Sequence, residues 1–120
     1  MPRSDSLQPA ALHILLALTA GERHGYALMT DIAELSDGAL QIGPGTLYGS
    51  IKRLLTAGLI EESDARPDED EDDQRRRYYQ ITVAGRALLS AEVARLAKLV
   101  TVASQRKLLR QPVRPRLGEA

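Results

Sequence analysis

Apolar residues recur at helical spacing in four segments of this chain. The approximate ranges of these segments are 9–20, 24–35, 44–57 and 83–110. In the third segment, Leu47, Ile51 and Leu54 fall at i, i+4 and i+7, which places them on one face of an amphipathic helix. Pro44 suits the first turn of such a helix, and Gly58 suits the position just after its last turn. The pattern therefore predicts a mainly helical fold.

The other face of this third helix is small, polar and cationic. Its candidate contact residues are Thr46, Tyr48, Gly49, Ser50, Lys52 and Arg53. The major groove of DNA admits a helix with such a face. There we expect Thr46, Ser50 and Arg53 to contact base edges, and Lys52 and Tyr48 to contact phosphates. An ordinary polar surface helix is the alternative, and periodicity alone does not exclude it.

Two segments after Gly58 predict a β-hairpin. Residues 59–63 form the expected first strand and residues 75–82 its partner. Strand alternation sends Tyr79 and Ile81 to one face, so we expect Tyr79 to pack beneath the hairpin. The candidate DNA-binding residues of the second strand are Arg75, Arg76, Arg77 and Tyr78. A helix followed by a hairpin with a basic arm is the outline of a winged helix-turn-helix. Pairing of the arginines with the adjacent acidic tip of the hairpin is the alternative.

Shorter patterns predict the rest of this domain. The helix at 24–35 has four candidate buried residues, which are Tyr26, Leu28, Met29 and Ile32. Residues 36–38 (Ser-Asp-Gly) indicate a turn, and residues 40–42 are expected to form a short strand that pairs with the hairpin. Gly25 is expected to allow close approach of another helix, and His24 to have a structural role.

The last predicted helix, at residues 83–110, carries an apolar seam. The seam residues lie 4, 3, 4 and 3 positions apart, and they are Leu89, Val93, Leu96, Val100 and Ala103. Spacing of this kind is typical of helices that pair. An exposed seam would be an unusually large apolar patch, so we expect two copies of the chain to dimerise through it.

Four segments together resemble the PadR family of bacterial transcriptional regulators. They are HGYALM (24–29), PGTLYGSIKRLL (44–55), GLIEE (58–62) and RRRYYQIT (75–82). The resemblance covers roughly residues 10–100. It implies a winged helix-turn-helix with a long C-terminal dimerisation helix, and a repressor that binds a palindromic operator in double-stranded DNA as a homodimer. Family members commonly respond to a small-molecule effector. Here the last helix has no aromatic residue to stack on a flat ligand.

The formal net charge of zero hides an uneven distribution of charge. Residues 61–73 hold nine acids and one arginine, so the remaining chain has a net charge of +8. A basic body fits a nucleic-acid partner. The acidic run at residues 68–73 departs from the basic or small wing tips usual in such folds. A solvated loop is the favoured interpretation, with masking of the arginines or collection of divalent cations as alternatives.

Composition excludes several other classes. The chain has no cysteine, hence no disulfide or thiolate metal site, and no apolar run of membrane-spanning length. No nucleophile–base pair, metal cluster or phosphate-binding loop indicates an enzyme or a cofactor. We therefore expect a cytoplasmic, non-enzymatic protein. A protein-interaction module on the same scaffold is the rival. The expected organisation is a flexible arm (1–8), the winged domain (9–82), the dimerisation helix (83–110) and a flexible tail (111–120).

Overall fold

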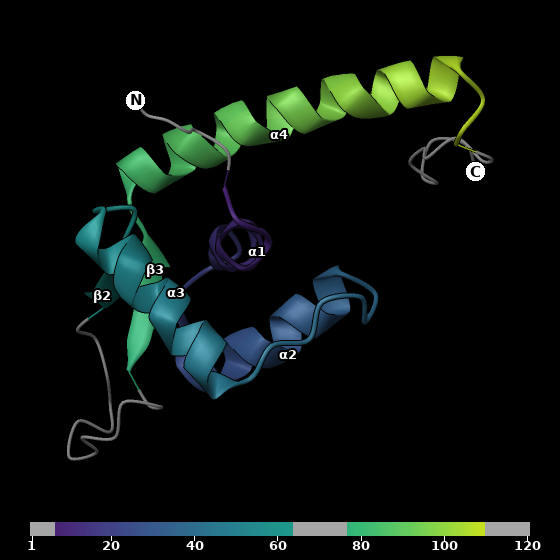
Figure 1. Cartoon of the computed structure of the whole chain (residues 1–120). Coiled ribbons are helices and arrows are strands. Elements are labelled where there is room, and N and C mark those ends of the chain that lie inside the picture. Colours follow the sequence, from purple (N-terminus) through teal and green to yellow (C-terminus); the bar gives the residue numbers. More distant parts are fainter. Residues whose placement is uncertain (1–6, 64–76, 110–120) are drawn as a thin grey trace, which may run out of the picture. The chain divides into compact units, whose positions relative to one another are not determined.

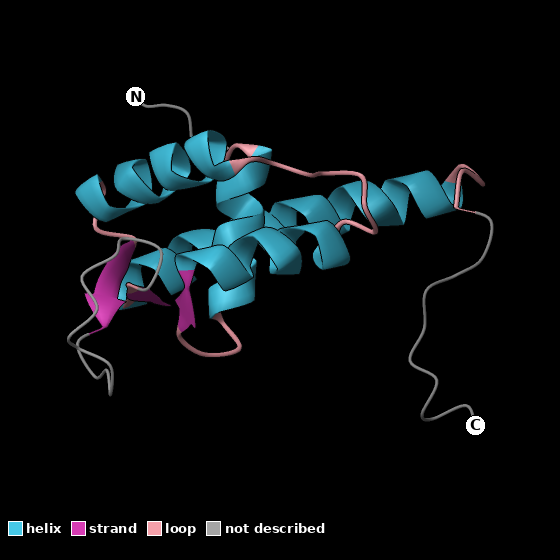
Figure 2. Cartoon of the chain, turned by 90° about the horizontal axis from the view of Figure 1, so that it is seen from below, coloured by secondary structure: helices cyan, strands magenta, loops and turns pink. Residues whose placement is uncertain are grey.

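The computed structural model describes residues 7–63 and 77–109 of the chain. The elements in chain order are α1 (Pro9–Leu18), β1 (Arg23–His24), α2 (Gly25–Leu35), α3 (Pro44–Thr56), β2 (Ile60–Ser63), β3 (Tyr78–Ile81) and α4 (Val83–Gln105) (Figure 1). The chain divides into two compact units, with the boundary after Ser90 in α4. Helices dominate and the strands form one small sheet (Figure 2), as the apolar periodicity predicts.

The core of the first unit is almost entirely aliphatic. Its most buried residues come from every helix and from the two longer strands, and they are Ile14, Leu15, Leu18, Leu28, Ile32, Leu47, Ile51, Leu54, Ile60, Tyr79 and Leu89. A fully buried Leu or Ile side chain contributes about 1.5–3 kcal/mol to the free energy of unfolding. Burial of α1, α2 and α3 against one another therefore fixes the positions of these helices. The helix α3 carries several of the candidate contact residues.

The sheet has the strand order β1-β3-β2, and both pairings are antiparallel. The expectation that residues 40–42 pair with the hairpin is wrong, because residues 23–24 form the third strand instead. The backbone N–H of Leu40 donates to the Ser36 hydroxyl at 2.9 Å, so its donor is satisfied without a neighbouring strand. Leu40 and Ile42 still pack against the core.

The predicted helix ends are confirmed by their capping geometry. Gly58 has a φ of +77°, and the N–H of Leu59 donates to the Leu54 carbonyl at 3.0 Å, as in a helix closed by glycine. Thr82 caps α4, because its hydroxyl accepts from the N–H of Gly85 at 3.0 Å. The same hydroxyl donates to the Gly58 carbonyl at 2.8 Å and joins the start of α4 to the end of α3.

Two expectations about burial are wrong. Tyr26 is 53% exposed, whereas Leu28 and Ile32 of the same helix are fully buried, because the core-facing stripe of α2 runs through these two residues. Leu89 is only 5% exposed and belongs to the core of the first unit, so it is not available to a second copy of the chain. Among the remaining seam residues, Val93 and Val100 are exposed, and Leu96 and Ala103 are half-buried.

Within the described residues, none of the helices is both long and apolar enough to cross a membrane. In α4, Arg95 lies beside Glu92, and the two side chains form an ion pair at 2.7 Å.

Replacing Leu89 by Ala is expected to destabilise the first unit. Truncation of a buried leucine leaves a cavity and lowers the free energy of unfolding by about 2–5 kcal/mol. Urea denaturation followed by circular dichroism measures this loss. The matched control is Val83→Ala at the start of the same helix, where the side chain is 86% exposed. The control should change stability by no more than about 0.5 kcal/mol. Equal effects of the two substitutions would contradict the placement of Leu89 in the core.

Candidate nucleic-acid interface

The candidate recognition helix, α3, has a buried face and an exposed cationic face. Leu47, Ile51 and Leu54 are buried, whereas Lys52 and Arg53 are exposed. The N-cap residue Gly43 has no side-chain oxygen to accept from the first-turn N–H groups. The positive end of the helix dipole at that terminus favours an anion nearby. Side chains and backbone of α3 therefore present positive potential on the side away from the core.

Two of the small candidate residues on α3, Thr46 and Gly49, are accessible to a partner. Thr46 is exposed in the first turn, and Gly49 is half-buried one turn later. A Cβ built at Gly49 would meet only the end of the Arg53 guanidinium, at 3.9 Å from Nη1. The helix backbone at Gly49 is thus open to close approach.

Ser50 does not lie on the exposed face, and the expectation that it contacts a base is wrong. Its side chain is only 3% exposed. Ser50 comes three residues after Leu47 and four before Leu54, so it shares their core-facing side of the helix. Its hydroxyl lies 3.4 Å from Nη2 of Arg53, the donor in a long hydrogen bond. The spacing from Leu47 was the signal that could have identified Ser50 as buried.

Tyr48 is also turned inwards, which contradicts its assignment to a phosphate. The residue packs against the core and its hydroxyl oxygen is buried. The ring lies against Gly25 at the start of α2, where a Cβ would come within 2.5 Å of the hydroxyl oxygen. The expected close approach at Gly25 is therefore confirmed, and the approaching group is the Tyr48 ring.

Polar side-chain pairs join the two strands of the hairpin. Arg77 donates from Nη1 to Oε2 of Glu62 at 3.1 Å, and both side chains are about half exposed. Gln80 donates to Glu61 at 2.7 Å. Arg77 thus has an acidic neighbour on β2, which is not part of the acidic tip. Arg75, Arg76 and the acidic run at 68–73 lie outside the described residues.

Tyr78 and Tyr79 point to different surroundings, as strand alternation predicts. Tyr78 is half-buried and meets the His24 ring edge-on, with 5.3 Å between ring centroids and 84° between planes. Tyr79 is fully buried, which confirms its expected position beneath the hairpin. Burial, together with a smaller contribution from the charge of Glu62, raises the pKa of Tyr79 to about 12.

His24 has the structural role that the sequence indicates. Its Nδ1 atom accepts from the N–H of Ala27 at 3.1 Å and so caps α2. Among residues 7–63 and 77–109, no cluster of three His, Cys, Asp or Glu side chains could hold a metal ion.

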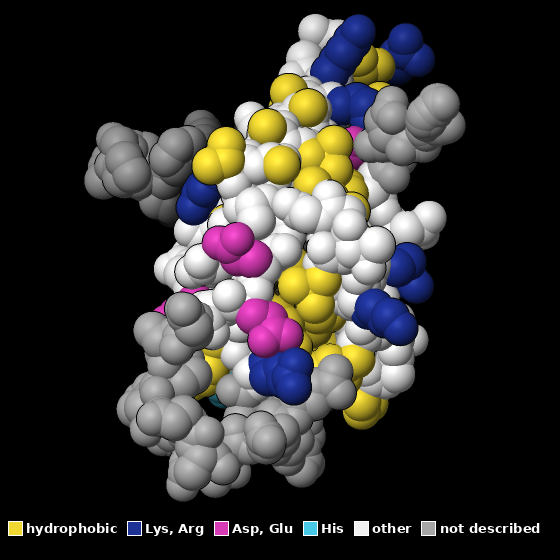
Figure 3. Space-filling view, turned by 90° about the vertical axis from the view of Figure 1, so that its left-hand side faces the viewer, with side chains coloured by type: hydrophobic (Ala, Val, Ile, Leu, Met, Phe, Trp, Pro, Cys, Tyr) yellow, Lys and Arg dark blue, Asp and Glu magenta, His cyan; other side chains and the backbone are white. Residues whose placement is uncertain are grey.

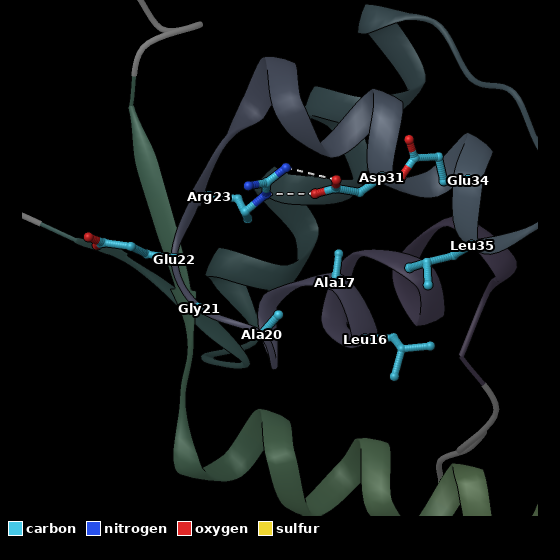
Figure 4. A pocket seen from close by; sticks show the side chains of 9 residues that line it. All are labelled: Leu16, Ala17, Ala20, Gly21, Glu22, Arg23, Asp31, Glu34 and Leu35. Carbon is cyan, nitrogen blue, oxygen red and sulfur yellow. Dashed lines mark hydrogen bonds and ion pairs between the residues drawn. The ribbon is translucent and has the colours of Figure 1, made fainter. Parts of the chain in front are cut away.

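A groove of about 380 Å³ lies beside α1, β1 and α2 (Figure 4). Its lining residues are Leu16, Ala17, Ala20, Gly21, Glu22, Arg23, Asp31, Glu34 and Leu35. Arg23 and Asp31 form two parallel hydrogen bonds across one wall, both 2.8 Å long. These bonds raise the pKa of Arg23 above its ordinary value. The ion pair joins β1, which pairs with the hairpin, to α2.

Charged side chains are distributed unevenly over the surface. In the space-filling view, lysine and arginine side chains stand in small groups, with acidic side chains between some of them (Figure 3). On the face shown, charges of both signs are therefore mixed.

Three packed helices, of which the third has a cationic exposed face, and the hairpin that follows them define the winged helix-turn-helix class. Residues 14–91 match the transcriptional regulator PadR-like family. The chain belongs to this family of transcription regulators, which confirms the resemblance seen in the sequence.

Known proteins similar to the chain agree with this assignment. Transcriptional regulator Rv3488 of Mycobacterium tuberculosis is 40% identical over 88 residues, which cover 73% of this chain and 76% of that protein. An uncharacterized 37.1 kDa protein in transposon TN4556 of Streptomyces fradiae is 39% identical over 90 residues. These cover 75% of this chain but only 24% of that longer protein. A PadR family transcription regulator from Clostridium difficile R20291 has a similar fold, with a TM-score of 0.67 and 22% identity over 82% of this chain and 97% of that one.

The raised pKa of Tyr79 predicts loss of stability in alkali. Because the folded-state pKa of about 12 lies above the ordinary value of 10.0, the neutral phenol stabilises the fold fully below pH 10. This contribution, about 2 kcal/mol, is lost as the pH rises from 10 through 12. Urea denaturation at several pH values should therefore give a shallower decline for Tyr79→Phe than for the wild type.

The control for this experiment is Tyr26→Phe, which makes the same substitution at an exposed tyrosine. The decline with pH should be the same in this variant as in the wild type. A Tyr79→Phe variant that declines as steeply as the wild type would show that another group causes the alkaline loss.

Proposed function

We propose that the chain is a sequence-specific DNA-binding regulator, and that it represses transcription by binding a palindromic operator as a homodimer. The observation that carries this proposal is the two-sided character of α3. Its aliphatic face is held in the core, while Thr46, Lys52 and Arg53 are exposed with no acid among them. A helix fixed in this way presents its cationic side to the major groove.

Within the groove, each exposed residue of α3 has a role that suits its chemistry. The guanidinium of Arg53 matches the two acceptors of a guanine edge. Lys52 is a point charge that suits a phosphate, and Thr46 is short enough to contact a base near the start of the helix. Gly49 lets the helix backbone come close to the DNA. Ser50 and Tyr48 support α3 from behind and contact no DNA in this proposal.

The wing contributes phosphate contacts in this proposal. Arg77 is half exposed, and its ion pair with Glu62 is of the kind that contributes only about 0–1 kcal/mol. Arg77 can therefore exchange Glu62 for a phosphate as its partner with little loss of free energy. We extend the same role to Arg75 and Arg76, which precede Arg77 in the sequence, and to the accessible side of Tyr78.

Dimerisation is proposed through the exposed apolar residues of α4. Val93, Leu99 and Val100 are each between 44% and 54% exposed, which is unfavourable for aliphatic side chains in water. Leu96 and Ala103 complete the seam. A two-fold dimer would read half-sites about 10 bp apart, or a multiple of that spacing. Occupation of a promoter by the dimer would then block transcription.

The rival function is a protein-interaction module that does not bind DNA. Its best support is the acidic content of residues 61–73. An interaction module would be free to carry large aliphatic or acidic residues on the exposed face of α3. In this chain, that face carries neither. A regulatory small molecule has less support, because the described part of α4 offers no aromatic residue for stacking.

Arg53→Ala is expected to weaken binding to the operator by about 1–3 kcal/mol if Arg53 reads a base. The operator is obtained by selection from a random duplex library with the wild-type protein. Fluorescence anisotropy then compares the selected duplex with a scrambled one at two salt concentrations. Equal losses on both duplexes would assign Arg53 to a phosphate instead.

The matched control is Lys52→Ala, which removes the neighbouring cation and should weaken binding to both duplexes alike. It should also lower the slope of log K against log salt by about one, because one fewer counterion is released. Wild-type protein that binds neither duplex at low salt would contradict the DNA-binding proposal and favour the interaction module.

Val100→Asp is expected to convert the dimer to a monomer, because a carboxylate would be buried without a partner at the centre of the seam. Sedimentation velocity measures the oligomeric state. The matched control is Thr101→Asp, which places the same charge on an exposed neighbour outside the seam and should leave the dimer intact. A wild-type protein that is monomeric at micromolar concentration would contradict the dimer proposal.

A further inference from the structure

At the start of α2, a neighbouring ring occupies the space that a side chain would need, so this position requires a glycine. Gly25 is buried and is the first residue of α2. A Cβ built at this position would lie 2.5, 2.8 and 2.9 Å from the hydroxyl oxygen, Cε1 and Cζ of Tyr48. These separations are far shorter than van der Waals contact, so the Tyr48 ring occupies the place where any other residue would have a side chain. Gly25 has no positive φ, which makes this close approach the reason for glycine here.

The Tyr48 ring belongs to the first half of the recognition helix. Tyr48 follows the fully buried Leu47 and precedes the exposed Lys52 by one turn. Its hydroxyl oxygen is buried, although the residue as a whole is half-buried. The contact with Gly25 therefore sets how closely this end of α3 approaches α2.

The wing is joined to the same point. Arg23 and His24, which directly precede Gly25, pair with Tyr79 and Tyr78 of β3. The His24 ring meets Tyr78 edge-on and also caps α2 through Nδ1. Tyr48 and Tyr79 are close enough to interact electrostatically, because Tyr48 contributes to the raised pKa of Tyr79. Residues 23–25 thus contact the recognition helix α3 on one side and the strand β3 on the other.

We propose that Gly25 and Tyr48 are positioning residues, which set the recognition helix relative to the wing and thereby determine base discrimination. This proposal rests on the proposed DNA-binding function. Neither residue needs to touch DNA. Hydrogen bonds to base edges require distances near 3 Å and good alignment, whereas attraction to phosphates acts over about 10 Å. A small displacement of α3 therefore reduces specific binding and leaves non-specific binding nearly unchanged.

The test uses the full chain, the selected duplex and a scrambled duplex of the same composition. Gly25→Ala should displace the ring and reduce the preference for the selected duplex by about tenfold, which corresponds to one lost base contact. Affinity for the scrambled duplex should stay within about twofold, because the phosphate-binding cations are unchanged. Tyr48→Leu should also reduce the preference, since the contact that seats α3 is lost.

The double variant Gly25→Ala with Tyr48→Leu separates this role from a backbone effect. Once the ring is gone, the added methyl group has room, so Gly25→Ala should change the preference by less than about twofold in this background. The control for simple destabilisation is Ile14→Val in the core of α1, which should lower the melting temperature and keep the preference. Amide NMR shifts at the start of α3 and in β3 should change more in Gly25→Ala than in this control.

Each outcome has a defined meaning. Wild-type preference in a folded Gly25→Ala variant would overturn the positioning proposal alone. An equal effect of Gly25→Ala in both backgrounds would overturn it too, because the loss would then be independent of the ring. If Gly25→Ala does not fold, Tyr48→Leu decides, and full preference in that variant contradicts the proposal. Wild-type protein that selects no sequence would instead refute the DNA-binding function on which the proposal depends.

Discussion

Burial of one face of α3 in an aliphatic core is the constraint on which the rest of the structure depends. Leu47, Ile51 and Leu54 are held between the other helices and the sheet, so rotation of α3 about its axis would expose them to water. Because these residues are fixed, the orientation of Lys52 and Arg53 is fixed as well. The core thus determines which side of the helix a partner meets, although no core residue contacts that partner.

The chain builds this core without phenylalanine or tryptophan, and two of its four tyrosines take their place. Tyr79 fills the space beneath the hairpin, and Tyr48 fills the space above Gly25. Both lie where elements distant in the sequence meet, and rings supply more contact area per residue than aliphatic side chains do. Because a ring is rigid, it holds its neighbours at a defined separation, which branched aliphatic side chains do less well. These two rings therefore hold α2, α3 and β3 at defined distances from one another.

Much of the fold could be predicted because local chemistry determines it. Pro44 and Gly58 delimit α3, Thr82 caps α4, and strand alternation placed Tyr79 in the core. The errors have different causes. Ser50 looks polar, yet its spacing puts it beside Leu54. The heptad spacing is continuous through Leu89, which gives no sign that this residue belongs to the first unit's core. The two-residue strand β1 is too short to have a pattern.

The candidate interface combines a rigid backbone with weakly held side chains. Arg53 has a long contact of 3.4 Å to the Ser50 hydroxyl, and Arg77 has an exposed ion pair with Glu62. Neither contact contributes much to stability, so in the proposed complex both arginines can exchange their partners for DNA at little cost. The backbone that carries them cannot move as easily, because the core and the Gly25–Tyr48 contact fix it. In the proposed complex, Lys52 and Arg77 would then supply affinity for any sequence, whereas discrimination would depend on Arg53 and on the fixed position of α3.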